Sequence, residues 1–289
     1  MRYVLITGVS SGIGLVSAQY LIGKGYFVFG SVRSEKRGNE LRGQLGPNFH
    51  PLVFDVRDLE GIHRSLAEVS AIVKNNLLVA LVNNAGIAVS GPIELIDQQE
   101  IKDQFDVNVV GLLNTTRAFL PLLGAGREPI KNPGRIINIS SIASSFTFPF
   151  QTLYAASKHA VESINDGLRR ELSLYGIKVI SIRPGPIKSE IWQKQMKEDK
   201  LYQGTVYAPI FEKKLDLVKS KEAGASPTEL VAKVIHQAIE LPKPKLKYLI
   251  YKNHFLYYFS RMIPDRWADY LIYRQMGKII SAKTTEAPW

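Results

Sequence analysis

The sequence of 289 residues contains no cysteine, so disulfide bonds, thiolate metal sites and cysteine nucleophiles are excluded. It also lacks any uninterrupted apolar run of the roughly 18–20 residues that a membrane-spanning helix needs. The N-terminal residues 2–6 lead directly into Thr7 and Gly8, which indicates a short strand and a glycine turn and not a cleavable leader. We therefore expect a cytoplasmic protein, with membrane association of the C-terminal end left open.

Acidic residues are scarce relative to basic ones. The 26 Asp and Glu stand against 37 Lys and Arg, a formal net charge of +11. Such an excess suits nucleic acid, a membrane surface or an anionic cofactor, and the total alone does not choose among them. Hydrophobic residues at 45% and charged residues at 22% are typical of globular proteins, which excludes disordered and fibrous classes.

Short apolar runs alternate with longer amphipathic stretches over the first 185 residues. The runs have continuous apolarity, which is typical of parallel strands covered on both faces. They are Tyr3–Ile6, Phe27–Val32, Pro51–Phe54, Leu77–Val82, Arg135–Ile139 and Val179–Ile182. Helical patterns lie between them at about 12–23, 58–75, 100–123 and 153–175. This alternation predicts an α/β fold, a Rossmann-type doubly wound parallel sheet of about seven strands with helices on both faces.

The pattern changes after residue 185, although we expect residues 1–289 to form a single domain. Residues 186–225 are polar and rich in lysine, and we interpret them as a substrate loop. Ser226 as N-cap and Glu229 three residues later predict a helix to about residue 240. Lys245–Tyr251 could add a strand, and the rest, to about 280, indicates one or two helices.

The C-terminal extension, residues 241–289, holds nine Lys and Arg against three Asp and Glu, together with ten of the 28 aromatic residues. This composition suits a cap over a substrate cleft or a contact with a partner subunit. Alternatively, the extension could lie on an anionic membrane. Nucleic acid is not expected as a partner, because no nucleic-acid motif accompanies the basic and aromatic residues.

A glycine turn follows the first predicted strand in the sequence Thr7-Gly-Val-Ser-Ser-Gly-Ile-Gly14. Glycines permit a tight turn and a close approach of backbone to a ligand, and the following helix offers free N–H groups to a pyrophosphate. The TGxxxGIG form resembles the short-chain dehydrogenase/reductase family. Three further motifs extend the resemblance over residues 1–185: Asp55-Val56, Asn83-Asn84-Ala85-Gly86, and Tyr154 with Lys158.

The candidate catalytic residues begin with Tyr154 and Lys158. They stand four apart in a helical pattern and so share one face, where a lysine ammonium favours the phenolate form of the tyrosine. Ser141 follows the fifth strand and has the family's spacing for a serine that stabilises the substrate oxygen, with neighbouring Ser140 as the competing assignment. Asn108 matches the family's helix-embedded asparagine, which kinks the helix and supports a proton relay.

The resemblance also implies cofactor contacts. The turn and helix start would hold the pyrophosphate, through Gly8, Ser10, Ser11, Gly12, Ile13 and Gly14. Asp55 and Val56 would bound the adenine, and Asn83, Ala85 and Gly86 would line the adenosine side. Tyr154 and Lys158 would also contact the cofactor. Pro184, Gly185, Ile187 and Ser189 would lie beside the nicotinamide, with Ser189 standing where the family commonly has threonine.

The second predicted strand lacks the acidic residue that normally accepts the ribose hydroxyls of NAD. It ends at Arg33, and no carboxylate follows before Glu35. Arg33 can meet a 2′-phosphate, and Ser11 could add a hydroxyl, so NADP(H) is favoured over NAD(H). A solvated arginine with no role in binding is the alternative.

Residues 144–150 and 87–89 are apolar and would wall the substrate pocket, which favours a hydrophobic alcohol or ketone. The sequence therefore predicts an NADP(H)-dependent oxidoreductase that interconverts such an alcohol and ketone by direct hydride transfer, without a metal. An NAD-linked alcohol dehydrogenase working oxidatively and a non-catalytic NADP-binding sensor are the alternatives. The resemblance implies a homodimer or homotetramer assembled through the helices near 100–123 and 153–175.

Overall fold

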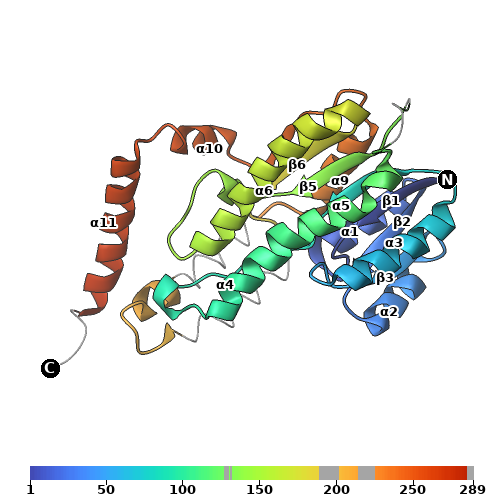
Figure 1. Ribbon diagram of the computed structural model, residues 1–289. Helices are drawn as coiled ribbons and strands as arrows, with labels where there is room; N and C mark the ends of the chain where they lie inside the picture. The colour runs from blue at the N-terminus through green and yellow to red at the C-terminus, as the bar shows by residue number, and fades with distance from the viewer. Residues whose placement is uncertain (127–129, 131, 189–201, 214–224, 285–289) are drawn as a thin grey trace.

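Seven parallel strands form one sheet at the centre of the molecule, in the order β3-β2-β1-β4-β5-β6-β7 (Figure 1). The computed structural model describes residues 1–126, 130, 132–188, 202–213 and 225–284. The strands are β1 Arg2–Ile6, β2 Tyr26–Val32, β3 Phe49–Val53, β4 Leu78–Asn83, β5 Arg135–Ile139, β6 Lys178–Pro184 and β7 Lys247–Ile250. The chain winds outward in both directions from β1 and β4, which confirms the predicted doubly wound sheet.

Helices cover both faces of the sheet. One face carries α1 Gly12–Ile22, α2 Glu35–Leu45 and α9 Thr228–Glu240, and the other carries α3 Leu59–Val73, α5 Gly111–Leu123 and α6 Thr152–Glu171. The helix α4 Gln98–Phe105 leads into α5. Beyond β7, α10 His254–Ser260 and α11 Asp265–Thr284 extend away from these layers (Figure 1).

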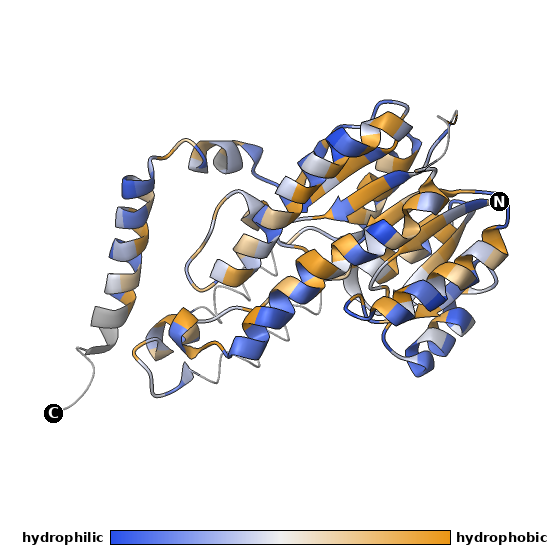
Figure 2. Cartoon of the chain, viewed as in Figure 1, coloured by the Kyte–Doolittle hydropathy of each residue, from blue (hydrophilic) through white to orange (hydrophobic). Residues whose placement is uncertain are grey.

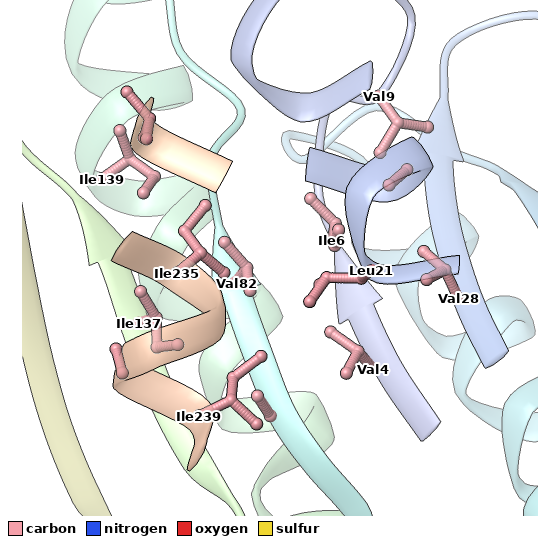
Figure 3. Close-up of a cluster of buried hydrophobic side chains, with 14 of the residues drawn as sticks. Val4, Ile6, Val9, Leu21, Val28, Val82, Ile137, Ile139, Ile235 and Ile239 are labelled. Atoms are coloured by element: carbon pink, nitrogen blue, oxygen red, sulfur yellow. The ribbon is translucent and has the colours of Figure 1, made fainter. Parts of the chain in front are cut away.

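The core lies between the sheet and its helices. Val4 of β1 and Val82 of β4 pack with Leu21 of α1 and with Ile235 and Ile239 of α9, and all five are buried (Figure 3). A second cluster fills the opposite face around Phe29, Phe119 and Ile136. Because helices cover both faces, most strand residues are apolar, whereas helices such as α3 and α6 carry both apolar and polar residues (Figure 2).

Three local predictions need correction. The sequence did not predict α2, because its interior has little apolar periodicity. The N-terminus of α2 is capped by the Ser34 hydroxyl, which accepts from the Arg37 N–H at 3.4 Å. Ser226 is not the N-cap of α9: that position is Pro227, with no side-chain cap, so the predicted capping box is wrong. The single helix predicted over 100–123 is interrupted by a π-helical turn, Asp106–Val110.

The segment predicted as a substrate loop, 186–225, is described only in part. Ile187 pairs with Ser226 in a parallel bridge, and residues 208–213 are helical. Residues 189–201 and 214–224 of that segment lie outside the described residues.

Candidate active site

A cavity of about 600 Å³ opens at the carboxyl ends of the strands. Residues that directly follow β1 to β6 line it, which is where ligands bind in open α/β sheets. The glycine turn, Arg33 and Asp55 lie at one end, and Tyr154 lies between that end and an apolar outer part. The outer lining includes Phe148, Pro149, Phe150, Ile210, Lys213, Ile272, Gln275, Met276 and Ile279.

Tyr154 and Ser141 face each other in this cavity and are joined by a side-chain hydrogen bond. Tyr154 stands in the first turn of α6, and Ser141 follows β5 directly, so the sheet and the helix bring the two hydroxyls together. The Ser141 hydroxyl also accepts from the Ala143 N–H at 3.1 Å. This second bond fixes its direction.

Ser140 points elsewhere. The residue borders the cavity, but its hydroxyl lies toward the Glu162 carboxylate, which is not part of the lining. Successive side chains of an extended strand point to opposite faces, so only one of the two serines can meet Tyr154. The geometry thus favours Ser141 over Ser140 as the serine beside the reacting oxygen.

Lys158 lies one turn after Tyr154 on α6 and is buried. Its ammonium donates to the Ile139 carbonyl at 2.9 Å and lies 5.8 Å from the centre of the Tyr154 ring. Burial lowers the pKa of Lys158 to about 8, and the nearby Glu162 carboxylate opposes this shift.

The pKa of Tyr154 moves opposite to the sequence-based argument. Its densely surrounded hydroxyl loses water, and this desolvation raises the pKa above the ordinary value, while the hydrogen bond with Ser141 lowers it in part. The raised pKa keeps Tyr154 protonated at neutral pH, because the desolvation outweighs the hydrogen bond with Ser141.

Asn108 lies in the π-helical turn between α4 and α5. Its amide accepts from the Ile87 N–H at 2.9 Å, donates to the Ile87 carbonyl at 3.0 Å and donates to the Ser157 hydroxyl at 3.1 Å. The side chain thus joins the loop after β4 to α6. A Cβ on Gly86 would lie 3.2 Å from the Asn108 oxygen, so only glycine leaves this junction undisturbed.

The turn after β1 has the features that a dinucleotide phosphate requires. Gly8 has a φ of +70°, and a Cβ there would lie 2.9 Å from the Ala85 Cα. Gly12 begins α1, and the Ser11 side chain makes no capping hydrogen bond to it. The first N–H groups of α1 therefore remain available, with the positive end of the helix dipole, for an anionic group.

Most of the predicted site residues line the cavity together. Among the described ones, the predicted cofactor residues Gly14 and Asn83 and the predicted catalytic residue Asn108 do not. Gly14 serves packing, since a Cβ there would lie 2.2 Å from the Gly8 carbonyl oxygen. Asn83 instead joins a buried network, donating to Thr116 and Asn138 at 2.9 Å each. Ser189 lies outside the described residues. The residues that do line it are Gly8, Ser10, Ser11, Gly12, Ile13, Arg33, Asp55, Val56, Ala85, Gly86, Ser141, Tyr154, Lys158, Pro184, Gly185 and Ile187.

Two basic residues lie near the glycine turn. Arg33 is exposed and lines the cavity beside Ser11. Arg37, which the sequence reading did not consider, donates from Nη2 to the Ser10 carbonyl at 2.9 Å and so holds the turn. No local pattern identifies it, because α2 itself was not predicted and its partner, Ser10, lies 27 residues earlier in the chain. Asp55 is held by Arg57, whose hydrogen bonds lower the pKa of the Asp55 carboxyl.

The arrangement can accept a dinucleotide along the glycine turn and a second, apolar molecule beside Tyr154. A carbonyl oxygen placed between the Ser141 and Tyr154 hydroxyls would receive two hydrogen bonds, and the tyrosine would have a proton to give. No group of three or more His, Asp or Glu side chains that could hold a metal ion occurs among the described residues.

Comparisons with known proteins agree with this geometry. Residues 2–200 match the family model described as short chain dehydrogenase. The chain is 39% identical over 280 residues to the NADPH-dependent 3-dehydrocapnine reductase of Ornithobacterium rhinotracheale, covering 96% of this chain and 99% of that protein. It is 31% identical to human retinol dehydrogenase 16 over 86% of this chain and 80% of that protein. A solved serine dehydrogenase in complex with NADP⁺ is 28% identical, with a TM-score of 0.70 over 86% of this chain and 94% of that one.

Proposed function

The chain belongs to the short-chain dehydrogenase family, and on that premise we propose that it is an NADP(H)-dependent oxidoreductase that interconverts a hydrophobic secondary alcohol and its ketone. The observation that carries the proposal is the hydrogen-bonded pair of Tyr154 and Ser141, with Lys158 one turn away, inside a cavity that begins at a glycine turn. The relative most similar to it among those described above is itself named a reductase that depends on NADPH.

The catalytic roles follow from the positions of the side chains. Ser141 holds the substrate oxygen and orients it toward Tyr154. Tyr154, whose raised pKa keeps it protonated at neutral pH, donates the proton to that oxygen in the reductive direction. Lys158 stabilises the phenolate that remains, and Asn108 keeps the loop after β4 in register with α6.

The cofactor contacts are proposed on the residues that line the cavity. The free N–H groups at the start of α1 would hold the pyrophosphate, and Arg33 would meet the 2′-phosphate. Asp55 and Val56 would bound the adenine, while Pro184, Gly185 and Ile187 would flank the nicotinamide. When bound there, NADPH supplies the hydride. The Asn83 side chain, engaged in its buried network, would act only by steadying the sheet.

The apolar outer part of the cavity supports a hydrophobic substrate. Phe148, Pro149 and Phe150 line this part together with Ile210 and residues of α11. It has one cation, Lys213, and no carboxylate among the described lining residues. Two relatives are named for 3-dehydrocapnine and for retinol, which supports a lipophilic carbonyl or hydroxyl compound.

The proposal is tested by Tyr154→Phe and Ser141→Ala, with Ser140→Ala as the matched control. Loss of general acid catalysis and of the oxygen contact each typically lowers kcat by about 100-fold or more, whereas Ser140→Ala should retain most of the activity. The measurement is NADPH absorbance with a panel of hydrophobic ketones, together with cofactor binding by fluorescence.

The same measurement separates the alternatives. Tight NADPH binding without turnover of any ketone would favour a sensor. Faster turnover with NAD⁺ and alcohols than with NADPH and ketones would favour an oxidative, NAD-linked enzyme. Equal losses in Ser140→Ala and Ser141→Ala would contradict the assigned serine.

Assembly and location are proposed more broadly. We infer a homodimer or homotetramer that uses the helices near 100–123 and 153–175, supported by the exposed apolar side chains Val110 and Leu113 beside α5. Among the described residues, no helix has the length and apolarity to span a bilayer. We place the protein in the cytoplasm, with the C-terminal region able to contact one surface of a membrane.

A further inference from the structure

Exposed aromatic side chains are concentrated in the C-terminal arm, which we define as residues 254–278 of α10, α11 and the turn between them. Six of the seven exposed aromatic side chains among the described residues lie there, and Met262 and Leu271 are exposed beside them. The aromatic six are Phe255, Tyr258, Phe259, Trp267, Tyr270 and Tyr273. A soluble surface rarely gathers so many without a partner.

Cations lie among these aromatic residues. Residue 252 and the arm together hold five Lys and Arg against two Asp, and all five basic side chains are exposed. On α11, Trp267, Tyr270 and Arg274 fall at helical spacing on one face, and Lys278 extends it by one turn. Tryptophan and tyrosine with basic residues on one helix face are typical of helices that lie in a membrane interface.

The opposite face of α11 belongs to the cavity. Ile272, Met276 and Ile279, spaced four and three residues apart, line its outer part. The helix therefore has an apolar face toward the candidate substrate and an aromatic, cationic face away from it. The alternation of apolar and polar residues around α11 is visible in Figure 2.

Tyr257 fixes the arm to the body of the protein. It is buried, its hydroxyl lies 2.7 Å from the Ser145 hydroxyl, and Arg183 of β6 donates to it at 3.4 Å. Ser145 belongs to the segment that follows Ser141. The arm is thus attached beside the catalytic segment, and α11 extends from it away from the sheet (Figure 1).

We propose that the C-terminal arm docks on the surface of an anionic lipid bilayer and that the lipophilic substrate enters the cavity from that bilayer, past the inner face of α11. The proposal rests on the proposed reduction of a hydrophobic ketone. A second copy of the chain fits the same face less well, because a two-fold contact would set one cationic, aromatic face against another. An anionic lipid surface complements the charge, and its interface accommodates the aromatic rings.

Binding is tested with the full chain and vesicles of phosphatidylcholine, alone or mixed with phosphatidylglycerol, by co-sedimentation. We expect binding to the anionic vesicles that is at least about tenfold stronger than to the neutral ones and that weakens with added salt. The double variants Trp267→Gln/Tyr270→Gln and Arg266→Glu/Arg274→Glu should each lose about tenfold in binding. The double variant Leu174→Gln/Leu246→Gln, at exposed apolar positions on the body, is the matched control and should bind as the wild type does.

Substrate delivery is tested by comparing a short, water-soluble ketone with a long-chain ketone held in the anionic vesicles. We expect the arm variants to reduce the soluble ketone at the wild-type rate and to lose about tenfold on the vesicle-held ketone, in proportion to lost binding. Circular dichroism confirms that the variants are folded.

Equal binding of both vesicle types, or equal binding by arm and control variants, would overturn the proposal. So would light scattering that shows the arm variants to be smaller in solution than the wild type, since the arm would then contact a second copy. If the wild type reduces neither ketone, the proposed function fails, while the vesicle measurement still decides the docking surface.

Discussion

Desolvation decides the chemistry of Tyr154. Its pKa is raised because the hydroxyl is densely surrounded, so the group is a proton donor at neutral pH until a further positive charge favours the phenolate. Burial lowers the pKa of Lys158 to about 8. Below that pH the side chain remains an ammonium and can stabilise a phenolate. We therefore expect the proposed carbonyl reduction to be favoured at neutral pH and to weaken as the pH rises, which a pH profile of kcat measures.

At the residue scale, we propose that Arg33 sets the preference for NADPH. Arg33→Asp removes a charge-assisted contact to a 2′-phosphate and replaces it with a repulsive one, so we expect KM for NADPH to rise by about 10- to 100-fold with little change for NADH. Steady-state kinetics with both cofactors measures the preference.

Lys36→Asp is the control for this prediction, because it makes the same charge change on an exposed residue of α2 outside the cavity lining. It should leave the preference for NADPH nearly unchanged. An unaltered preference in Arg33→Asp would show that the arginine is merely solvated.

At the scale of elements, the Glu162–Arg183 pair joins α6 to β6. The Arg183 Nε donates to Glu162 at 2.8 Å, and both side chains are nearly buried. Glu162→Gln leaves a buried guanidinium without its countercharge, and we expect a loss of about 3 kcal/mol in the free energy of unfolding at pH 7, measured by chemical denaturation.

The pH dependence of stability provides the check. Although burial opposes the shift, hydrogen bonds from Arg183 and Ser181 hold the pKa of Glu162 below its ordinary value. Its stabilising contribution is therefore fully present above the unfolded pKa of about 4.3 and is lost as the pH falls through the lower folded value. Wild type and Glu162→Gln should converge in stability at acidic pH; a difference that is constant with pH would contradict the assignment.

The π-helical turn shows how one residue shapes an element. The Asn108 amide is saturated by Ile87 and Ser157, which lie outside its own helix, and this pulls the turn out of the α-helical path between α4 and α5. The sequence motif identified the asparagine, but its partners come from two other segments. Only the folded chain brings them together.

At the scale of the whole molecule, we propose that the chain assembles through helices outside the sheet. Leu113 of α5 is 38% exposed and Val110 just before it is 44% exposed. If they lie in a subunit interface, Leu113→Glu buries an unpaired charge there and should shift the oligomer to monomers at micromolar concentration. Analytical ultracentrifugation measures the change.

Leu174→Glu, at a position 78% exposed next to Gly176, is the matched control and should leave the sedimentation unchanged. A monomeric wild type, or an oligomer that tolerates Leu113→Glu, would show that the interface lies elsewhere. Either result is independent of catalysis, since Leu113 is outside the cavity lining.

The place of most candidate site residues around one cavity could be predicted, because they lie at fixed places in the chain relative to strand ends. Tyr154, Lys158, Ser141 and the glycine turn were all identified from spacing, and the cavity brings them together. Arg37 and the outer wall of α11 were not identified, since each acquires its place through a contact with a segment distant in sequence. The cap of α9 was misread because serine and glutamate at the right spacing need not point at the helix N-terminus.

The sequence by itself determined the parallel sheet, because continuous apolar strands can be buried only between helices on both faces. It also contains the candidate catalytic and phosphate-binding motifs, whose spacing is local. The tertiary structure decided which of Ser140 and Ser141 meets Tyr154, which way burial moves the tyrosine's pKa, and which face of α11 lines the cavity. These depend on the density and direction of atoms brought together from distant segments, which no local pattern of residues encodes.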